Sequence, residues 1–184
     1  MTDEIIDDET QSSSTSEAGK QPPLLERIAT EFRRLNAAAA TGDLAALRRM
    51  NGYAVPPAAF YRIMSRANAP EMGPETVRRW ARAVAIMAQR PDALRASGLG
   101  RTLKDIGLSE QRLDMLLHAR GPALYDLAQR TAVRIARSHE YLPYRDLCLM
   151  VLYDTDPQTD DVRIGIAQSY LRANSNSSAI GTPI

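Results

Sequence analysis

The spacing of apolar residues is the feature that most limits the folds open to this chain. Between residues 25 and 171 apolar side chains recur every three or four positions, and Leu25, Ile28, Phe32 and Leu35 form the first such stripe. This spacing is typical of helices that bury one face. Segments with alternating β-branched residues, which would indicate strands, are almost absent. The pattern therefore predicts an all-α protein with no sheet.

Prolines and glycines divide this body into about eight or nine helices. Pro56-Pro57, Pro74 and Pro143 are each expected to open a helix, because proline suits the first helical turn. A loop is expected at residues 97–101, where two glycines fall close together, and a short helix to Ile106 is expected after it. We expect the helices to pack as two abutting small bundles, residues 24–107 and residues 108–173.

The two ends of the chain differ from the body in composition. Residues 1–23 combine acidic side chains with a serine-rich run, and residues 174–184 are mostly small and polar. We expect a disordered acidic tail and a flexible tail, since neither segment offers enough apolar surface to fold. The acidic tail is interpreted as inert, with folding back over the basic body as the alternative. No secretion signal or membrane span is recognised, so a cytoplasmic protein is expected.

The formal net charge of +1 hides a strong sorting of charges along the chain. Residues 1–26 carry seven acidic side chains and one Lys, whereas residues 27–139 carry nineteen basic against nine acidic. Every basic residue except Lys20 and Lys104 is arginine, whose planar guanidinium suits phosphate groups. The basic body therefore predicts a polyanionic partner such as nucleic acid.

Residues with catalytic or metal-binding chemistry are few and poorly placed. Cys148 lies in an apolar run and is interpreted as a buried, inert thiol. His118 and His139 are the only histidines, which leaves no set of zinc ligands. The segment 154–156 begins like a calcium loop but lacks its later ligands and is interpreted as a turn. We expect no catalytic residue, no metal site and no cofactor.

Several short motifs follow one another in an order that suggests a family. They are Ala46-Leu47-Arg48-Arg49, Phe60-Tyr61-Arg62-Ile63, Leu99-Gly100-Arg101-Thr102-Leu103, Arg112-Leu113-x-x-Leu116-Leu117, Leu127-x-x-Arg130-x-x-Val133-Arg134 and Leu142-Pro143-Tyr144-x-x-Leu147. Over roughly residues 27–153 the chain resembles the CasB family, the small subunit of the type I-E CRISPR surveillance complex Cascade. It departs from that pattern at Tyr144 and Tyr153, where the family usually has tryptophan.

The resemblance implies an all-helical, non-catalytic subunit of a ribonucleoprotein that takes part in antiviral defence. Two copies usually lie head to tail within the complex, so a second copy of the chain is one implied partner. The other implied partners are CasC-type backbone subunits, a CasA-type large subunit, the CRISPR guide RNA and the target and displaced DNA strands. Arginine on rigid helix faces would stabilise the R-loop through backbone contacts, because opening the duplex is a nearly balanced exchange.

Two sets of arginines are therefore candidates for binding nucleic acid. The first set lies in the motifs that resemble the family and comprises Arg48, Arg49, Arg62, Arg101, Arg112, Arg130 and Arg134. The second set rests on charge and helical facing alone and comprises Arg78, Arg79, Arg82, Arg120 and Arg137.

Two other functions remain open at this point. Residues 102–112 could form a helix-turn-helix whose second helix reads DNA, which would make the protein a transcriptional regulator. Such a regulator would prefer one duplex site by about 10³ or more over random DNA. A purely structural helical adaptor would instead show no salt-dependent binding of nucleic acid.

Overall fold

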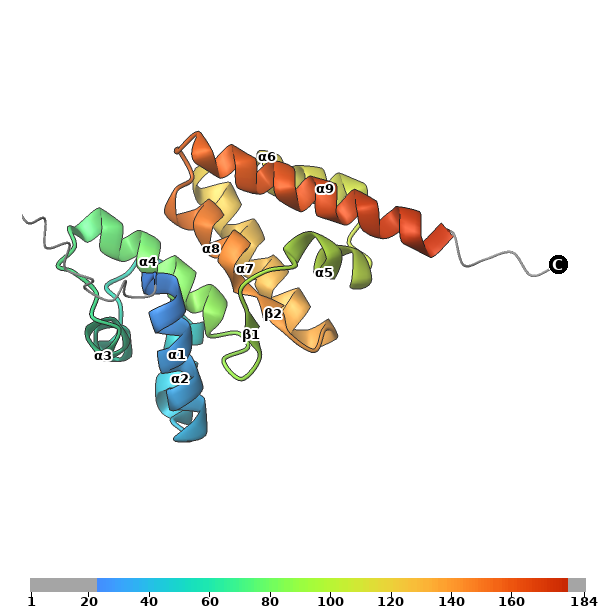
Figure 1. The fold of residues 1–184 in the computed structure, drawn as a ribbon. Coiled ribbons are helices and arrows are strands. Elements are labelled where there is room, and N and C mark those ends of the chain that lie inside the picture. Colours follow the sequence, from blue (N-terminus) through green and yellow to red (C-terminus); the bar gives the residue numbers. More distant parts are fainter. Residues whose placement is uncertain (1–22, 179–184) are drawn as a thin grey trace, which may run out of the picture.

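The computed structural model of this chain describes residues 23–178, with side chains to residue 173. The predicted acidic tail, apart from residue 23, and residues 179–184 lie outside the described residues. Nine helices and one pair of two-residue strands make up the described part (Figure 1). The all-α fold and the helix number are confirmed. The expectation of no sheet is wrong, because β1 (Leu94–Arg95) pairs in parallel with β2 (Leu142–Pro143).

The first four helices pack together at one end of the molecule. They are α1 (Leu24–Ala37), α2 (Thr41–Arg48), α3 (Ala58–Arg66) and α4 (Pro74–Met87), and α1, α2 and α3 contact one another pairwise. The expected stripe on α1 is buried, with Ile28 and Phe32 fully enclosed. Burial of this apolar face, rather than helix propensity, holds such short helices in place.

The remaining five helices form the other end of the molecule. They are α5 (Leu99–Asp105), α6 (Glu110–His118), α7 (Gly121–Ser138), α8 (Tyr144–Leu152) and α9 (Gln158–Ser178). In Figure 1 α9 runs along this end and contacts α5, α6 and α8. Its backbone continues to Ser178, so residues 174–178, where we expected a flexible tail to begin, are helical.

Helix α4 connects the two ends through a single apolar core. It contacts α1 and α2 on one side and α7 and α8 on the other. Its residues 83–87 are almost entirely inaccessible, and one cluster of buried apolar side chains extends from Leu25 to Tyr170. The short β1–β2 ladder adds a second connection, between the loop after α4 and the start of α8. The two groups of helices thus share one core.

A glycine inside α5 explains why that helix lies so close to α9. We expected a loop at residues 97–101, but α5 begins at Leu99, and only Gly98 has a left-handed backbone with φ of 101°. Gly100 is buried within α5, and a Cβ there would lie 2.3 Å from the Ile166 carbonyl oxygen of α9. The loop is therefore shorter than expected and ends at Gly98, and the short helix expected after it is present. Because residue 100 has no side chain, the backbones of α5 and α9 can meet there. Helix α5 lies within residues 24–107, which we expected to form the first bundle, but it packs on α9 of the other group of helices.

Candidate nucleic-acid interface

Three arginines of the first candidate set meet at a groove between α6 and α7. Arg112 comes from α6, whereas Arg130 and Arg134 lie one turn apart on α7. The groove measures about 370 Å³, and apolar side chains supply most of the rest of its lining. We call it the α6/α7 groove, and its other lining residues are Leu108, Met115, Leu116, Leu127 and Thr131. Met115 is about half exposed, so the apolar floor is open to solvent.

Local structure fixes the position of each arginine in the α6/α7 groove. The Ser109 hydroxyl caps α6 by accepting a 3.4 Å hydrogen bond from the Arg112 amide, which places Arg112 in the first turn. The Arg134 guanidinium donates to the carbonyl oxygens of Ile106 and Gly107 at 3.0 and 3.2 Å. It thereby satisfies carbonyl groups at the end of α5, where helical partners are missing. Arg134 is therefore a structural side chain as well as a source of positive charge.

The charges of Arg112 and Arg130 remain available to a ligand. Arg130 is 74% exposed and lies 3.9 Å from the Asp126 carboxylate, a distance at which a solvent-exposed ion pair is weak. The Arg112 side chain is exposed and has no ion pair within the described residues. A groove with an apolar floor and exposed guanidinium groups can bind a phosphate chain while its aliphatic side chains pack against sugars and bases.

The other four arginines of the first set lie outside the α6/α7 groove. Arg48 donates from Nε to the Ala88 carbonyl oxygen at 2.8 Å and so joins α2 to the end of α4. Arg62 forms an ion pair with Asp43 at 2.6 Å. Arg49 lines a separate hollow beside the loop that follows α2, and Arg101 is exposed on α5. The first set is therefore spread over several surfaces.

Most arginines of the second set make internal contacts. Arg78 and Arg79 pair with Glu75 at 3.3 and 3.7 Å. The Arg82 guanidinium lies 3.7 Å from the ring centre of Tyr125 and 5.1 Å from that of Tyr53.

The last two members of the second set differ from each other. Arg120 pairs with Asp160 at 3.1 Å and also donates to the carbonyl oxygens of Leu117 and Ala119. Arg137 is exposed and has no ion pair within residues 23–173. Among residues 23–173, Arg82 and Arg137 are thus the members of this set without a carboxylate partner, and of these two Arg82 lies over tyrosine rings.

A second cluster of arginines, which neither candidate set includes, lines a larger cleft beside α1 and α3. The cleft measures about 550 Å³ and also reaches Leu94 of β1 and Ala96, which follows that strand. Its basic residues are Arg27, Arg33 and Arg34 of α1 and Arg66 of α3, and we call it the α1/α3 cleft. The consecutive Arg33 and Arg34 were a signal in the sequence, but the approach of Arg66 depends on how two helices pack.

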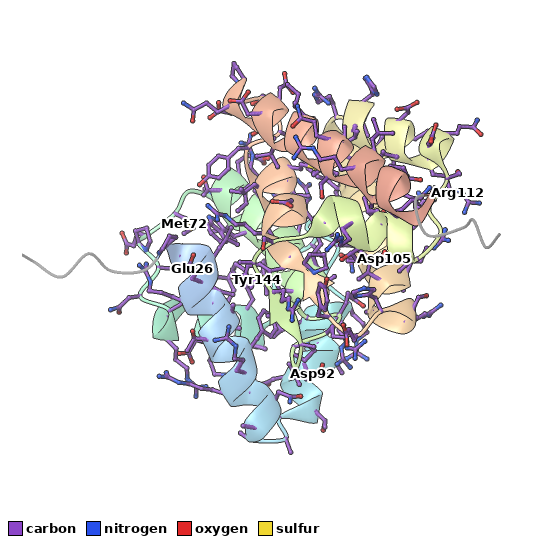
Figure 2. The ribbon with its side chains drawn as sticks, turned by 45° about the vertical axis from the view of Figure 1, so that its right-hand side comes forward. Glu26, Met72, Asp92, Asp105, Arg112 and Tyr144 are labelled. Atoms are coloured by element: carbon purple, nitrogen blue, oxygen red, sulfur yellow. The ribbon has the colours of Figure 1, made fainter. Side chains whose placement is uncertain are left out.

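The lining of the α1/α3 cleft also includes one tyrosine and two acidic side chains, which affect its net charge. Tyr144, whose ring is buried, also lines it, and Glu26 lies near Tyr144 beside the first turn of α1 (Figure 2). Burial raises the pKa of the Tyr144 phenol, and the Glu26 carboxylate adds to that effect, so the phenol stays neutral. Glu31 contributes a second carboxylate. The cleft is thus basic but partly neutralised.

A comparison with protein families identifies the chain. The family described as CRISPR-associated protein Cse2 matches residues 43–171. The chain belongs to the Cse2 family. Cse2 is the small subunit of the type I-E CRISPR complex Cascade, as the resemblance to CasB suggested. Comparisons with the curated proteins and with the solved structures gave no match.

The Cse2 match covers the α6/α7 groove completely and the α1/α3 cleft only in part. All twelve candidate arginines fall between residues 43 and 171, whereas α1 precedes the matched range. The regulator hypothesis loses support, because the family is a Cascade subunit. The exposed side of α6 also carries Glu110 and Asp114, which would repel the phosphates of a DNA major groove.

The described part of this Cse2 chain contains little that resembles a reactive centre. Cys148 is fully buried, as predicted, and burial raises the pKa of its thiol strongly. Residues 23–173 contain no group of three or more His, Cys, Asp or Glu side chains that could hold a metal ion. No helix of the described chain is both long and apolar enough to span a membrane.

Proposed function

We propose that this Cascade small subunit binds the sugar–phosphate backbone of nucleic acid in the α6/α7 groove and has no catalytic role. The observation that carries the proposal is the convergence of Arg112, Arg130 and Arg134 on one partly apolar groove. Guanidinium groups neutralise phosphates without reading sequence, and the aliphatic side chains beside them can pack against sugars and bases. Such contacts suit a guide RNA or the DNA strands of an R-loop.

Modest binding energy is enough for this role. The RNA–DNA hybrid formed in an R-loop is about as stable as the DNA duplex that it replaces, so protein contacts to the backbone decide the balance. Each exposed arginine contributes little alone, but several on one rigid surface add their charges without a large ordering cost. We infer that the groove stabilises the open state of the target DNA.

The first test removes the two exposed charges of the groove. Full-length protein carrying Arg112→Ala and Arg130→Ala should bind single-stranded oligothymidylate more weakly than the original chain. The magnitude of the slope of log Kobs against log salt should fall by about 0.7 for each lost contact. Arg134 is left intact because its guanidinium supports the end of α5. Fluorescence anisotropy over a range of salt concentrations measures both quantities.

A charge-matched control separates the effect of the groove on binding from the effect of the net charge of the protein. Arg145 of α8 and Arg172 of α9 are exposed and lie outside the groove, so Arg145→Ala with Arg172→Ala removes the same net charge elsewhere. The control should keep the original slope. Equal losses in both double variants would contradict the proposal, and binding without salt dependence would favour a purely structural adaptor.

We further propose that an exposed apolar surface near α3 contacts a protein subunit of the complex, either a second copy or a backbone or large subunit. Tyr53, Val55 and Tyr61 are 54%, 86% and 48% exposed and border a hollow of about 360 Å³. Exposed apolar patches of this kind mark interaction sites. Val55→Asp should reduce co-purification with the other Cascade subunits, while circular dichroism stays unchanged. Undiminished co-purification would exclude this surface.

A further inference from the structure

The α1/α3 cleft contains two arginines whose charges are not matched by nearby carboxylates. Arg34 pairs with Glu31 at 2.6 Å, and Arg27 donates from Nε to the Ala67 carbonyl oxygen at 2.7 Å. Arg33 and Arg66 are exposed, and neither has a carboxylate within ion-pair distance among residues 23–173. The cleft therefore has unmatched positive charge at two points, one on each helix.

The N-terminal segment of the chain has the complementary charge and is attached at the edge of this cleft. Residues 1–22 carry six carboxylates and one Lys, and the acidic residues are Asp3, Glu4, Asp7, Asp8, Glu9 and Glu17. The segment joins α1 at Leu24, and Glu26 and Arg27 in the first turn of that helix already line the cleft. Arg33 lies about 14 Å along α1 from Leu24, at about 1.5 Å per residue. Even Glu17, the acidic residue of this segment nearest to α1, lies far enough from Pro23 to extend about 20 Å, at about 3.3 Å per residue, so the carboxylates can reach the cleft. A tether this short gives an effective concentration on the order of millimolar.

We propose that residues 1–22 bind back into the α1/α3 cleft as an intramolecular polyanion. Their carboxylates pair with Arg33 and Arg66 and compete there with phosphate chains. The docking follows from charge and attachment, whereas the competition rests on the proposed binding of nucleic acid, extended here to the cleft as a second phosphate-binding surface beside the α6/α7 groove. The partly neutralised cleft suits such an occupant, because Glu26 and Glu31 weaken its hold and keep the docking reversible.

Residues 1–22 docked in the α1/α3 cleft would lie away from the α6/α7 groove. In Figure 2 Glu26, at the cleft, and Arg112, at the groove, lie at opposite sides of the molecule. The docked segment would therefore leave the groove open and cover only the second basic surface. Free subunits would bind random nucleic acid less well at the cleft until a competing strand or subunit displaces the segment.

A spin label in the acidic segment tests the docking directly. Ser13→Cys provides the attachment point in the full-length chain, and the buried Cys148 thiol does not compete for the label. The nitroxide should broaden the amide NMR signals of Arg33 and Arg66 at low salt, and high salt should restore them. Arg33→Glu with Arg66→Glu should abolish the broadening of the cleft signals, whereas Arg112→Glu with Arg130→Glu should not. Broadening centred on the α6/α7 groove, or no broadening at low salt, would overturn the proposal.

Affinity measurements on full-length chains test the competition. Replacing the six acidic residues by their amides should tighten binding of oligothymidylate about three- to tenfold, if the segment occupies the cleft for most of the time. Adding Arg33→Ala and Arg66→Ala should remove that gain. An unchanged affinity, or a gain that persists without the two arginines, would overturn the competition. If no variant binds the oligonucleotide, the proposed function fails, but the spin label still decides whether the segment docks.

Discussion

At the scale of single residues, Gly100 has the most demanding position in the chain. Any side chain there would enter the backbone of α9, with its Cβ 2.3 Å from the Ile166 carbonyl oxygen and 2.8 Å from the Tyr170 amide nitrogen. Backbone atoms cannot move aside as a flexible side chain can. Gly100→Ala should therefore lower the free energy of unfolding by about 1–3 kcal/mol, as measured by urea denaturation.

Gly165 provides the matched control for that substitution. It lies within α9, and a Cβ at this position would meet nothing within 4 Å. Gly165→Ala should raise the free energy of unfolding by about 0.5–1 kcal/mol, because alanine loses less backbone entropy in a helix. Opposite signs for the two substitutions are the expected result. Two stabilising substitutions would show that α5 and α9 are not in close contact.

At the scale of elements, a buried carboxylate holds the start of α7 against the turn between α8 and α9. Asp154 accepts hydrogen bonds from the Gly121 amide at 2.5 Å and from the Arg163 guanidinium at 3.1 Å. Both Asp154 and Arg163 are almost inaccessible to solvent. The segment 154–156 is a turn, as predicted, but the sequence did not indicate that its first carboxylate binds a buried arginine.

Removal of this carboxylate should destabilise the C-terminal helices. Asp154→Ala leaves the buried Arg163 guanidinium with Asp160 as its remaining partner, so a loss of about 3 kcal/mol in the free energy of unfolding is expected. Asp161→Ala, at an exposed position in the first turn of α9, should cost less than about 1 kcal/mol. Thermal and urea denaturation of both variants measure the two losses in the free energy of unfolding. Similar losses would mean that the buried pair has no special role.

The sequence could predict features that depend on local geometry, but not those that depend on tertiary packing. Proline positions and apolar spacing depend on local geometry, so the helices and the buried face of α1 could be predicted. The α1/α3 cleft could not, because Arg66 joins Arg33 only through the packing of α3 on α1. The same holds for the α6/α7 groove, since spacing along one helix does not show which exposed arginines of another helix face it. Tertiary packing selects these neighbours.

At the scale of the whole molecule, the continuous core predicts one cooperative unfolding transition. Helix α4 carries Trp80, the only tryptophan, and packs against both groups of helices. Trp80 fluorescence and far-UV circular dichroism should therefore report the same midpoint in urea. Ile28→Ala in α1 and Ile135→Ala in α7 remove fully buried side chains and should each lower that common midpoint, at a cost of about 2–5 kcal/mol. Two separate midpoints would show that the two groups of helices unfold independently.

The guanidinium–carbonyl contacts also have a consequence for the evolution of the chain. Arg134 bridges the carbonyl oxygens of Ile106 and Gly107, and Arg90 bridges those of Ala136 and His139. In each case one guanidinium nitrogen makes both contacts, and a lysine ammonium would conserve the charge but is more strongly hydrated and therefore costlier to hold against two backbone carbonyl groups. Replacement of Arg134 or Arg90 by lysine would therefore weaken the contacts at these helix ends, although it keeps the charge. This mechanical constraint gives one reason why lineages carrying this architecture should retain arginine at such positions instead of drifting to lysine.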